Sequence, residues 1–207
     1  MTGVQTCALP IFTRADDPEL PTVLLMSMFQ FRHKIFRERL GWDVMSLDGM
    51  EVDVFDALRP VYILSSASDA VVNGCWRLLP TTGPYMLKHV FPELLHGTTP
   101  PQTPEVWELS RFAVDSSARS PQEKKVLRTM CGMVQNVLRF AEKNGIRQYV
   151  TVTSVALERY FRHFGVPMRR IGSGVVSYLG DVCSVACYID INDELRGAVR
   201  QLAAGLE

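Results

Sequence analysis

The sequence has no surplus of either charge, because 22 lysine and arginine residues balance 22 aspartate and glutamate residues. Proteins that bind nucleic acid usually carry a basic excess, so no nucleic-acid partner is expected. No apolar run approaches the roughly 18 residues that a membrane span requires. The N-terminus also lacks the basic start and long apolar stretch of a secretion signal. These absences predict a cytoplasmic protein with no membrane partner.

Cysteine is scarce and scattered, with five residues in the chain and no C-x-x-C spacing. A disulfide framework or a structural zinc site is therefore not expected, and buried free thiols are the ordinary interpretation. The four histidines show no metal-ligand spacing, and no G-x-S-x-G or Cys/His nucleophile pattern occurs. The sequence thus gives no support for metal catalysis or for covalent catalysis.

Apolar residues are plentiful, at 47% of 207 residues, which is enough for one domain with a substantial core. Residues 1–20 have neither helical nor strand periodicity and include the proline-containing stretch ADDPELP. We expect residues 1–20 to be a poorly ordered leader, native or foreign to the gene. Residues 21–207 are then expected to form a single domain.

Capping signals and hydrophobic periodicity predict alternating helices and strands. Thr22 can cap a helix that runs to about Leu40 and stops at Gly41. Ser120 begins a capping box with proline at the first helical position, and the amphipathic helix that follows should end at Gly145. Further helices are expected over 90–95, 156–164 and from Asp193, and strands over 61–65, 71–79, 106–114, 148–154, 175–179 and 182–191. This order predicts an α/β fold, a three-layer α/β/α sandwich with a mixed central sheet.

Residues 42–56, WDVMSLDGMEVDVFD, contain five carboxylates and no basic residue. An acidic run of this kind is usually a solvated loop. Here apolar residues alternate with the acids, so part of the segment should be buried, and buried carboxylates need cationic partners. Arg32, Arg77 and Arg111 stand in apolar sequence and are the candidate partners. For Arg77 and Arg111 the alternative is exposure at the edge of a sheet.

The predicted strand 106–114 carries three residues with catalytic potential. Glu108 and Ser110 share one face of the strand, because strand side chains alternate. Arg111 should point to the other face unless a β-bulge intervenes. Glu108 is a candidate general base, and the alternative is that it neutralises a buried arginine.

Arginines dominate the stretch 158–170, where Arg159, Arg162, Arg169 and Arg170 outnumber one acid, Glu158. The ordinary interpretation is a solvated helix face, and the functional one is a docking patch for an acidic partner. Arg169 also begins an R-x-x-G-x-G pattern like the pyrophosphate loop of acetyltransferases. That loop should precede a helix, whereas strand-like residues follow here.

Four segments carry a resemblance to a known family: RHKIFRERLGWDV, MEVDVFDAL, GCWRLLPTTGPYMLKHVFPELLHG and VWELSRFAV. They resemble the acyl-homoserine-lactone (autoinducer) synthases of bacterial quorum sensing, from about residue 29 to at least 192 and most densely over 32–114. The family's hallmark positions correspond to Arg32, Phe36, Trp42, Asp53, Asp56, Arg77, Phe91, Glu108, Ser110 and Arg111. The resemblance implies a fold like that of the GNAT acyltransferases, with a V-shaped cleft between strands.

The resemblance also implies a reaction between S-adenosylmethionine and a fatty acyl group on acyl carrier protein. The product is an acyl-homoserine lactone, and methylthioadenosine is released. S-adenosylmethionine is a substrate, and no metal or other cofactor is needed. Aromatic rings and carboxylates suit its sulfonium and α-amine, so its binding site is expected to comprise Arg32, Phe36, Trp42, Asp53, Asp56, Arg77 and Phe91.

Acyl transfer requires that the α-amine lose its proton, since its pKa of roughly 8 leaves most of it protonated at pH 7. Glu108 is expected to take this proton directly or through a water. Ser110, or backbone N–H groups near Arg77, would stabilise the oxyanion. The predicted catalytic group consists of Glu108, Ser110 and Arg111.

The acyl chain is expected in an apolar tunnel between the sheet and the long helix. Met130, Met133 and Val137 are candidate wall residues, although ordinary core packing is the alternative for each. Thr151, at a position that the family associates with 3-oxo recognition, favours a 3-oxo or 3-hydroxy chain together with Thr153 and Ser154. The four arginines Arg159, Arg162, Arg169 and Arg170 would dock the acidic carrier protein.

Two other functions remain open on the sequence alone. One is a different GNAT-type N-acyltransferase that uses acyl-CoA and another amine. The other is a non-catalytic domain that senses S-adenosylmethionine or a carrier protein.

Overall fold

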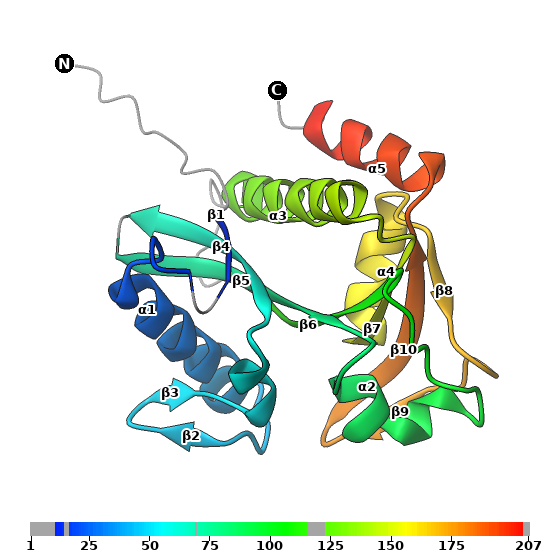
Figure 1. Ribbon diagram of the computed structural model, residues 1–207, viewed down its shortest axis with the longest axis horizontal. Helices are drawn as coiled ribbons and strands as arrows, with labels where there is room; N and C mark the ends of the chain where they lie inside the picture. Colours follow the sequence, from blue (N-terminus) through cyan, green and yellow to red (C-terminus); the bar gives the residue numbers. More distant parts are fainter. Residues whose placement is uncertain (1–10, 15–16, 69, 116–122, 205–207) are drawn as a thin grey trace.

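A twisted central sheet with helices on both faces makes up the chain (Figure 1). The computed structural model describes residues 11–14, 17–68, 70–115 and 123–204. The strands run in the order β1-β4-β5-β6-β7-β10-β8, with β9 paired to β10. Their bounds are β1 Ile11–Arg14, β4 Val61–Ser68, β5 Val71–Pro80, β6 Val106–Val114, β7 Gln148–Ser154, β8 Met168–Arg170, β9 Ser177–Leu179 and β10 Val182–Asp190. The sheet is mixed, because β6 and β7 are parallel while the other neighbouring strands are antiparallel.

Helices α3 (Glu123–Asn144), α4 (Val155–His163) and α5 (Asp193–Ala204) cover one face of this sheet. The apolar stripe predicted for α3 is buried there against strand residues such as Ile63 and Leu78. Helix α3 thus provides much of the buried apolar surface of this layer. The 3.6-residue period of its apolar residues was visible in the sequence.

The opposite face is covered in two parts. Helix α1 (Thr22–Arg32) and the π-helix η1 (His33–Arg39) pack over β4 and β5. Helix α2 (Met86–His89) and the 3₁₀ helix η3 (Pro92–Leu95) pack over β6, β7 and β10. A small hairpin, β2 (Ser46–Leu47) and β3 (Met50–Glu51), and the 3₁₀ helix η2 (Val54–Leu58) complete this layer. The predicted three-layer arrangement is confirmed.

Strands β6 and β7 pair only over their first halves. The parallel register begins at Val106 opposite Gln148 and ends at Leu109 opposite Thr151. Beyond that point β6 continues to Val114 and β7 to Ser154 with no further pairing between their described residues. The sheet therefore opens between these two strands, as the V-shaped cleft of the prediction requires.

Several predicted helix ends are wrong in detail. Helix α1 has Pro21 rather than Thr22 at its N-cap, with no side-chain cap bond, and beyond Arg32 it continues as a π-helix. Asn192 rather than Asp193 caps α5, since its Oδ1 accepts from the Leu195 N–H at 3.0 Å. The helix expected over 90–95 is present as the 3₁₀ helix η3 at Pro92–Leu95, whereas the preceding helix α2 and strand β8 were not predicted.

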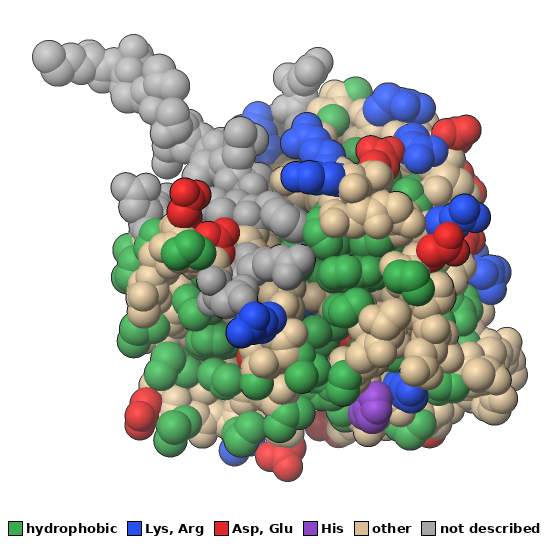
Figure 2. All heavy atoms as spheres, viewed as in Figure 1, with side chains coloured by type: hydrophobic (Ala, Val, Ile, Leu, Met, Phe, Trp, Pro, Cys, Tyr) green, Lys and Arg blue, Asp and Glu red, His purple; other side chains and the backbone are tan. Residues whose placement is uncertain are grey.

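The prediction of a poorly ordered leader is wrong for residues 11–14, because they form β1 and pair with β4 at the edge of the sheet. Residues 1–10 lie outside the described part of the chain, as does the predicted cap at Ser120. No helix in the described ranges is both long and apolar enough to cross a membrane. Figure 2 shows charged side chains gathered at the upper right of this view and many apolar side chains over its lower half.

Candidate functional site

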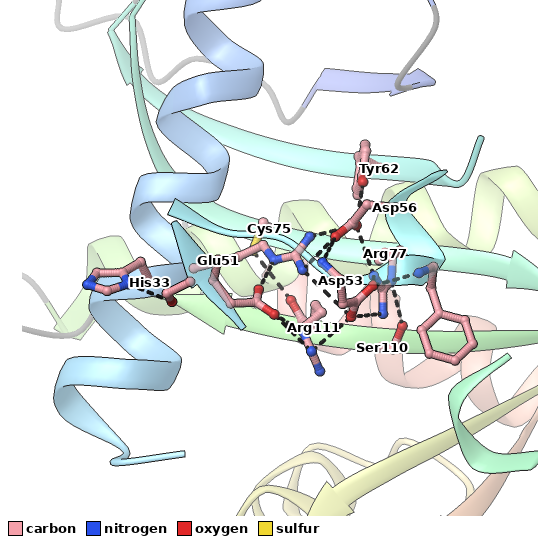
Figure 3. A network of polar contacts seen from close by, with 12 residues as sticks. His33, Glu51, Asp53, Asp56, Tyr62, Cys75, Arg77, Ser110 and Arg111 are labelled. Carbon is pink, nitrogen blue, oxygen red and sulfur yellow. Dashed lines mark hydrogen bonds and ion pairs between the residues drawn. The ribbon is translucent and has the colours of Figure 1, made fainter. Parts of the chain in front are cut away.

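Three arginines and three carboxylates meet between α1, the 42–56 segment and the sheet (Figure 3). The arginines are Arg32 at the end of α1, Arg77 in β5 and Arg111 in β6, and the carboxylates are Glu51 in β3 and Asp53 and Asp56 at η2. We call these six side chains the ionic cluster. Only Asp53 and Arg111 have appreciable exposure, with side chains 14% and 9% accessible.

Paired contacts hold the ionic cluster together. Arg77 donates from its two Nη atoms to the two oxygens of Asp53, at 2.5 and 3.0 Å. Arg111 donates to Glu51 Oε1 from Nε at 3.1 Å and from Nη2 at 2.9 Å, and Nη2 lies 2.8 Å from Asp53 Oδ2. Arg32 also pairs with Glu51. Buried charges persist when they are paired and hydrogen-bonded, so the predicted partnership of acids and arginines is confirmed.

Asp56 is the most heavily bonded carboxylate of the cluster. Its Oδ1 accepts from Arg32 at 2.8 Å, from Arg77 at 2.9 Å and from the Tyr62 hydroxyl at 2.6 Å. Burial alone would raise the pKa of the Asp56 carboxyl, but the two guanidinium groups outweigh it and hold that pKa well below its usual range. Asp56 is therefore an anion at any ordinary pH, with its oxygens occupied by protein groups.

A local capping box explains the shape of the acidic segment. Asp53 Oδ1 accepts from the Phe55 N–H at 2.9 Å, and Asp56 Oδ2 accepts from the Asp53 N–H at 2.8 Å. The D-x-x-D spacing therefore folds 53–58 into a 3₁₀ turn and presents both carboxylates to Arg77.

A β-bulge brings Arg111 to the same face as Glu108 and Ser110. Across β5 and β6, Arg77 is opposite Ser110, whereas Cys75 is opposite Ala113, so β6 has one extra residue. Arg111 takes up this residue in the left-handed region, with φ of 56°. The strand pattern alone did not decide whether a β-bulge is present. The structure contains the bulge, and without it Arg111 could not reach Glu51.

Glu108 lies against the start of α2. Its oxygens accept from the backbone N–H of Met86 at 2.9 Å and of Leu87 at 2.7 Å, and the residue is 1% exposed. Burial raises the pKa of the Glu108 carboxyl to about 7, although the two N–H bonds act in the opposite direction. Its bonds go to backbone N–H groups, and its titration near neutrality fits a general base. On the same face, Ser110 Oγ accepts from Arg77 Nε at 3.1 Å.

Aromatic rings adjoin the ionic cluster, as predicted for two of the three aromatic site residues. Phe36 and Trp42 stack with ring centroids 5.1 Å apart, and the Arg111 guanidinium carbon lies 5.5 Å from the centre of the Phe36 ring. Phe91 packs with the apolar residues around α2, and its N–H donates to the carbonyl of Met86 at 3.1 Å. Phe55, which was not predicted, lies 5.6 Å from the Arg77 guanidinium carbon.

Glu51, Tyr62 and Met86 also belong to the site although sequence reasoning did not select them. Glu51 bridges two arginines, and Met86 Sδ lies 3.0 Å from Arg77 Nη2. For Glu51 the available signal was its place in the acidic segment between two apolar residues. Nothing in the sequence distinguishes Tyr62 or Met86 from ordinary core residues.

The predicted acyl-chain residues are in different surroundings. Helix α3 buries Met130, Met133 and Val137 in the core between itself and the sheet. Of these three residues, only Val137 lines a small apolar cavity of about 20 Å³. The Thr151 hydroxyl donates to the Leu109 carbonyl at 2.9 Å, and the Ser154 hydroxyl caps α4 by accepting from the Leu157 N–H at 3.1 Å. Thr153 is half-buried. Ser154 thus has a structural task that the prediction did not foresee.

The predicted docking arginines are partly engaged within the protein. Arg170 donates to the buried Glu158 at 2.7 and 3.0 Å, and Arg162 lies 3.4 Å from the same carboxylate. The Arg169 guanidinium carbon lies 4.9 Å from the ring centre of Tyr188. Arg159 and Arg162 are exposed on α4. Among the described residues, no group of three or more histidine, cysteine or acidic side chains could hold a metal ion.

Known proteins resemble this chain over most of its length. The model of the autoinducer synthase family matches residues 19–199. The acyl-homoserine-lactone synthase of Aliivibrio fischeri is 41% identical over 186 residues, which cover 90% of this chain and 96% of that protein.

Two solved structures extend the likeness to the fold. The crystal structure of the AHL synthase LasI has a TM-score of 0.78 at 39% identity and covers 92% of this chain and 94% of its own. BjaI, a CoA-dependent acyl-homoserine lactone synthase solved with SAM and isopentyl-CoA, has a TM-score of 0.81 at 28% identity. It covers 95% of this chain and 90% of its own. The predicted fold class is confirmed.

Proposed function

Since the chain belongs to the autoinducer synthase family and is an acyltransferase of that family, we propose that it transfers a fatty acyl group from acyl carrier protein to the amine of S-adenosylmethionine. Closure of the ring then yields an acyl-homoserine lactone and methylthioadenosine. The observation that carries this proposal is Glu108, a buried carboxylate with a pKa near 7, in the strand that also bears Ser110 and Arg111.

The ionic cluster offers a binding surface for S-adenosylmethionine. Asp53 and Arg111 are its partly exposed members, and Phe36 and Trp42 stack beside Arg111. A carboxylate and aromatic rings suit the sulfonium and the α-amine, and a guanidinium suits the substrate carboxylate. The remaining members are covered by protein, and their role is to hold Asp53 and Arg111 in place.

Glu108 is well matched to an α-amine. Proton transfer from an amine with a pKa of roughly 8 to a carboxylate with a pKa near 7 is only slightly uphill in free energy. For a glutamate with an ordinary pKa the same transfer costs about 5 kcal/mol. Burial of Glu108 thus removes most of that free-energy cost, and the transfer is direct or through one water.

The acyl transfer and the ring closure follow from that deprotonation. The amine nitrogen attacks the thioester carbonyl, and the oxyanion is stabilised by Ser110 or by nearby backbone N–H groups. As the intermediate collapses, the carbon–sulfur bond of the thioester breaks and the departing carrier thiolate takes up the second proton of the nitrogen, which leaves the amide and the free carrier thiol. The substrate carboxylate then attacks the carbon next to the sulfonium, the carbon–sulfur bond breaks, and methylthioadenosine departs. This second step is intramolecular, so orientation supplies much of its acceleration.

The loop at the R-x-x-G-x-G pattern gives no support for a coenzyme A site there. A pyrophosphate loop requires free backbone N–H groups at the start of a helix. Here Gly172 packs against η3, where an added Cβ would be 2.8 Å from the Leu95 carbonyl oxygen, and strand β9 follows. The likeness to BjaI nevertheless makes acyl-CoA the competing donor.

One assay separates the donors. The protein is mixed with S-adenosylmethionine and the same acyl chain on carrier protein or on coenzyme A, and methylthioadenosine and lactone are followed by mass spectrometry. We expect lactone from acyl carrier protein at a kcat/KM at least tenfold above that from acyl-CoA. Equal or faster turnover with acyl-CoA contradicts the carrier-protein assignment, and turnover with another amine but not with S-adenosylmethionine contradicts the reaction.

A further inference from the structure

Met86, the first residue of α2, contacts both parts of the site. Its Sδ accepts from Arg77 Nη2 at 3.0 Å and from Arg111 Nη1 at 3.4 Å. Its backbone N–H donates to Glu108 Oε2 at 2.9 Å, and its side chain is buried. One residue thus joins the ionic cluster to the carboxylate that we propose as the base.

The strand pairing by itself would allow Glu108 to bind an arginine. Arg77 is opposite Ser110 and donates to its hydroxyl (Figure 3), so Glu108 is the diagonal neighbour of Arg77 on the same face of β5 and β6. Diagonal neighbours lie about 7–8 Å apart, a distance that a long side chain can span. Among the described residues, however, neither Arg77 nor Arg111 forms an ion pair with Glu108. The separation of these charges therefore depends on what lies between them.

Two carboxylates near the same arginines show the effect of this separation. Burial raises the pKa of the Asp56 carboxyl, but direct bonds from Arg32 and Arg77 outweigh it and hold that pKa well below its usual range. Burial raises the pKa of the Glu108 carboxyl to about 7, although its two N–H bonds and the more distant charges of Arg77 and Arg111 act in the opposite direction. A guanidinium in direct contact would lower the pKa of Glu108 further and make it a weaker base.

The thioether of Met86 suits the space between these groups because it is a neutral acceptor. Arg77 Nη2 also donates to Asp53 at 3.0 Å, and Arg111 donates from Nε and Nη2 to Glu51. The N–H groups that both arginines turn towards Met86 donate to its sulfur. Sulfur is a weak acceptor without charge, so it binds these N–H groups without adding a fourth carboxylate to three arginines and three acids.

Two kinds of group act on the charge of Glu108 from the surrounding elements. They are the guanidinium groups of Arg77 in β5 and Arg111 in β6, and the hydroxyl of Tyr85, which precedes α2. Tyr85 donates to the Pro101 carbonyl at 2.7 Å, and burial together with the charge of Glu108 raises the pKa of its hydroxyl, so Tyr85 stays neutral. The two arginines are therefore the charges that have to be kept away from Glu108.

We infer that Met86 is a positioning residue whose side chain occupies the space between the two arginines and Glu108. Both guanidinium groups then stay with their acids in the ionic cluster, and Glu108 stays available for the proton of the amine. This inference rests on the proposed function, in which Glu108 is the base. Met86 touches no reacting atom in that scheme and acts through Glu108.

Truncation of the Met86 side chain tests this role. Met86→Ala opens the space, so we expect one of the two arginines to pair with Glu108 and to lower the pKa of its carboxyl by about 1–3 pH units. Carbon-13 NMR of protein labelled at the glutamate carboxyls measures this pKa without turnover, and Glu108→Gln assigns the signal. The acidic limb of the pH–rate profile for lactone formation should move down from near pH 7 by a similar amount.

Three other variants separate this role from simple packing. Met86→Leu keeps most of the volume and should leave the titration of Glu108 and the acidic limb within about 0.3 pH units of the wild type. Met86→Val shortens the side chain with a smaller loss of volume, and it replaces Met86→Ala if that variant does not fold. Met28→Ala is the matched control, because Met28 is buried in the apolar layer over β4 and β5; it should lower stability without moving the titration.

An unmoved titration and an unmoved limb in a folded Met86→Ala or Met86→Val protein overturn the inference, even if kcat falls, because Met86 would then only support α2. The same conclusion follows if Met86→Leu or Met28→Ala shifts the titration as far as Met86→Ala does. If no acyl donor yields lactone while Met86→Ala still lowers the pKa of Glu108, the proposed reaction fails and the assignment of Met86 stands.

Discussion

Replacing Glu51 by glutamine should destabilise the protein far more than any exposed charge change. The ionic cluster contains three positive and three negative side chains, and Glu51 is shared by Arg32 and Arg111. Glu51→Gln keeps the shape of the side chain but leaves one uncompensated positive charge where Arg32 has no solvent exposure. Breaking a buried pair from one side typically costs 3–5 kcal/mol, so we expect a loss of about 3 kcal/mol. That is a large fraction of the roughly 5–15 kcal/mol that stabilises a typical domain.

Equilibrium unfolding in urea measures this loss, and the chain provides a matched control. Asp43 pairs with Arg37 at 3.1 Å, but their side chains are 106% and 48% exposed. Asp43→Asn removes the same charge at the surface and should cost less than about 1 kcal/mol. A Glu51→Gln loss no greater than that of Asp43→Asn would refute the reasoning, because it would mean that the cluster is not desolvated. Adding Arg111→Met to Glu51→Gln restores the charge balance and should recover part of the lost stability.

Four further predictions concern the base, the carrier surface and a buried acid. Glu108→Gln should lower kcat about 100-fold and abolish the acidic limb of the pH–rate profile near pH 7; an unchanged limb removes Glu108 as the base. Because burial raises its folded-state pKa, Glu108 contributes stability at acid pH that is lost as the pH rises towards 7, and unfolding of Glu108→Gln should show less of this dependence. Arg159→Glu should raise the KM for the carrier protein about tenfold without changing the KM for S-adenosylmethionine. Arg139→Glu, on α3, should change neither of these two KM values. Equal effects of Arg159→Glu on the KM of both substrates would indicate a structural role. Glu158, whose pKa is lowered by its hydrogen bond from Arg170, contributes stability that is lost as the pH falls through its folded-state pKa, so Glu158→Gln should cost about 1.5 kcal/mol at pH 7 and less at pH 4; an equal cost at both pH values contradicts the pairing.

Sequence patterns within one segment were sufficient to predict its secondary structure wherever that structure does not depend on distant parts of the chain. Strands 106–114 and 148–154 have the predicted bounds, and the long helix has its apolar stripe in the core. The burial of part of the 42–56 segment, which carries Glu51, Asp53 and Asp56 inward and leaves Asp43 and Asp48 exposed, was also predictable, because buried apolar residues draw adjacent carboxylates inward, and those carboxylates require counter-charges.

Contacts between distant segments were not predictable in the same way. Arg111 and Glu51 are 60 residues apart, and their contact depends on a one-residue offset between β5 and β6. No pattern within β6 reveals that offset, since it belongs to the pairing of two strands. Glu158 likewise becomes buried only because β8, a strand that the sequence did not reveal, delivers Arg170 to it.

The amino-acid order alone thus determined the long helices, the long strands of the sheet and which charges must be neutralised, because periodicity and burial are properties of short stretches. The tertiary structure alone decided which carboxylate each arginine binds, that Glu108 accepts from α2, and that the Met86 sulfur meets two arginines. These contacts join atoms that are far apart in the chain, and only the packed sheet and helices bring them together.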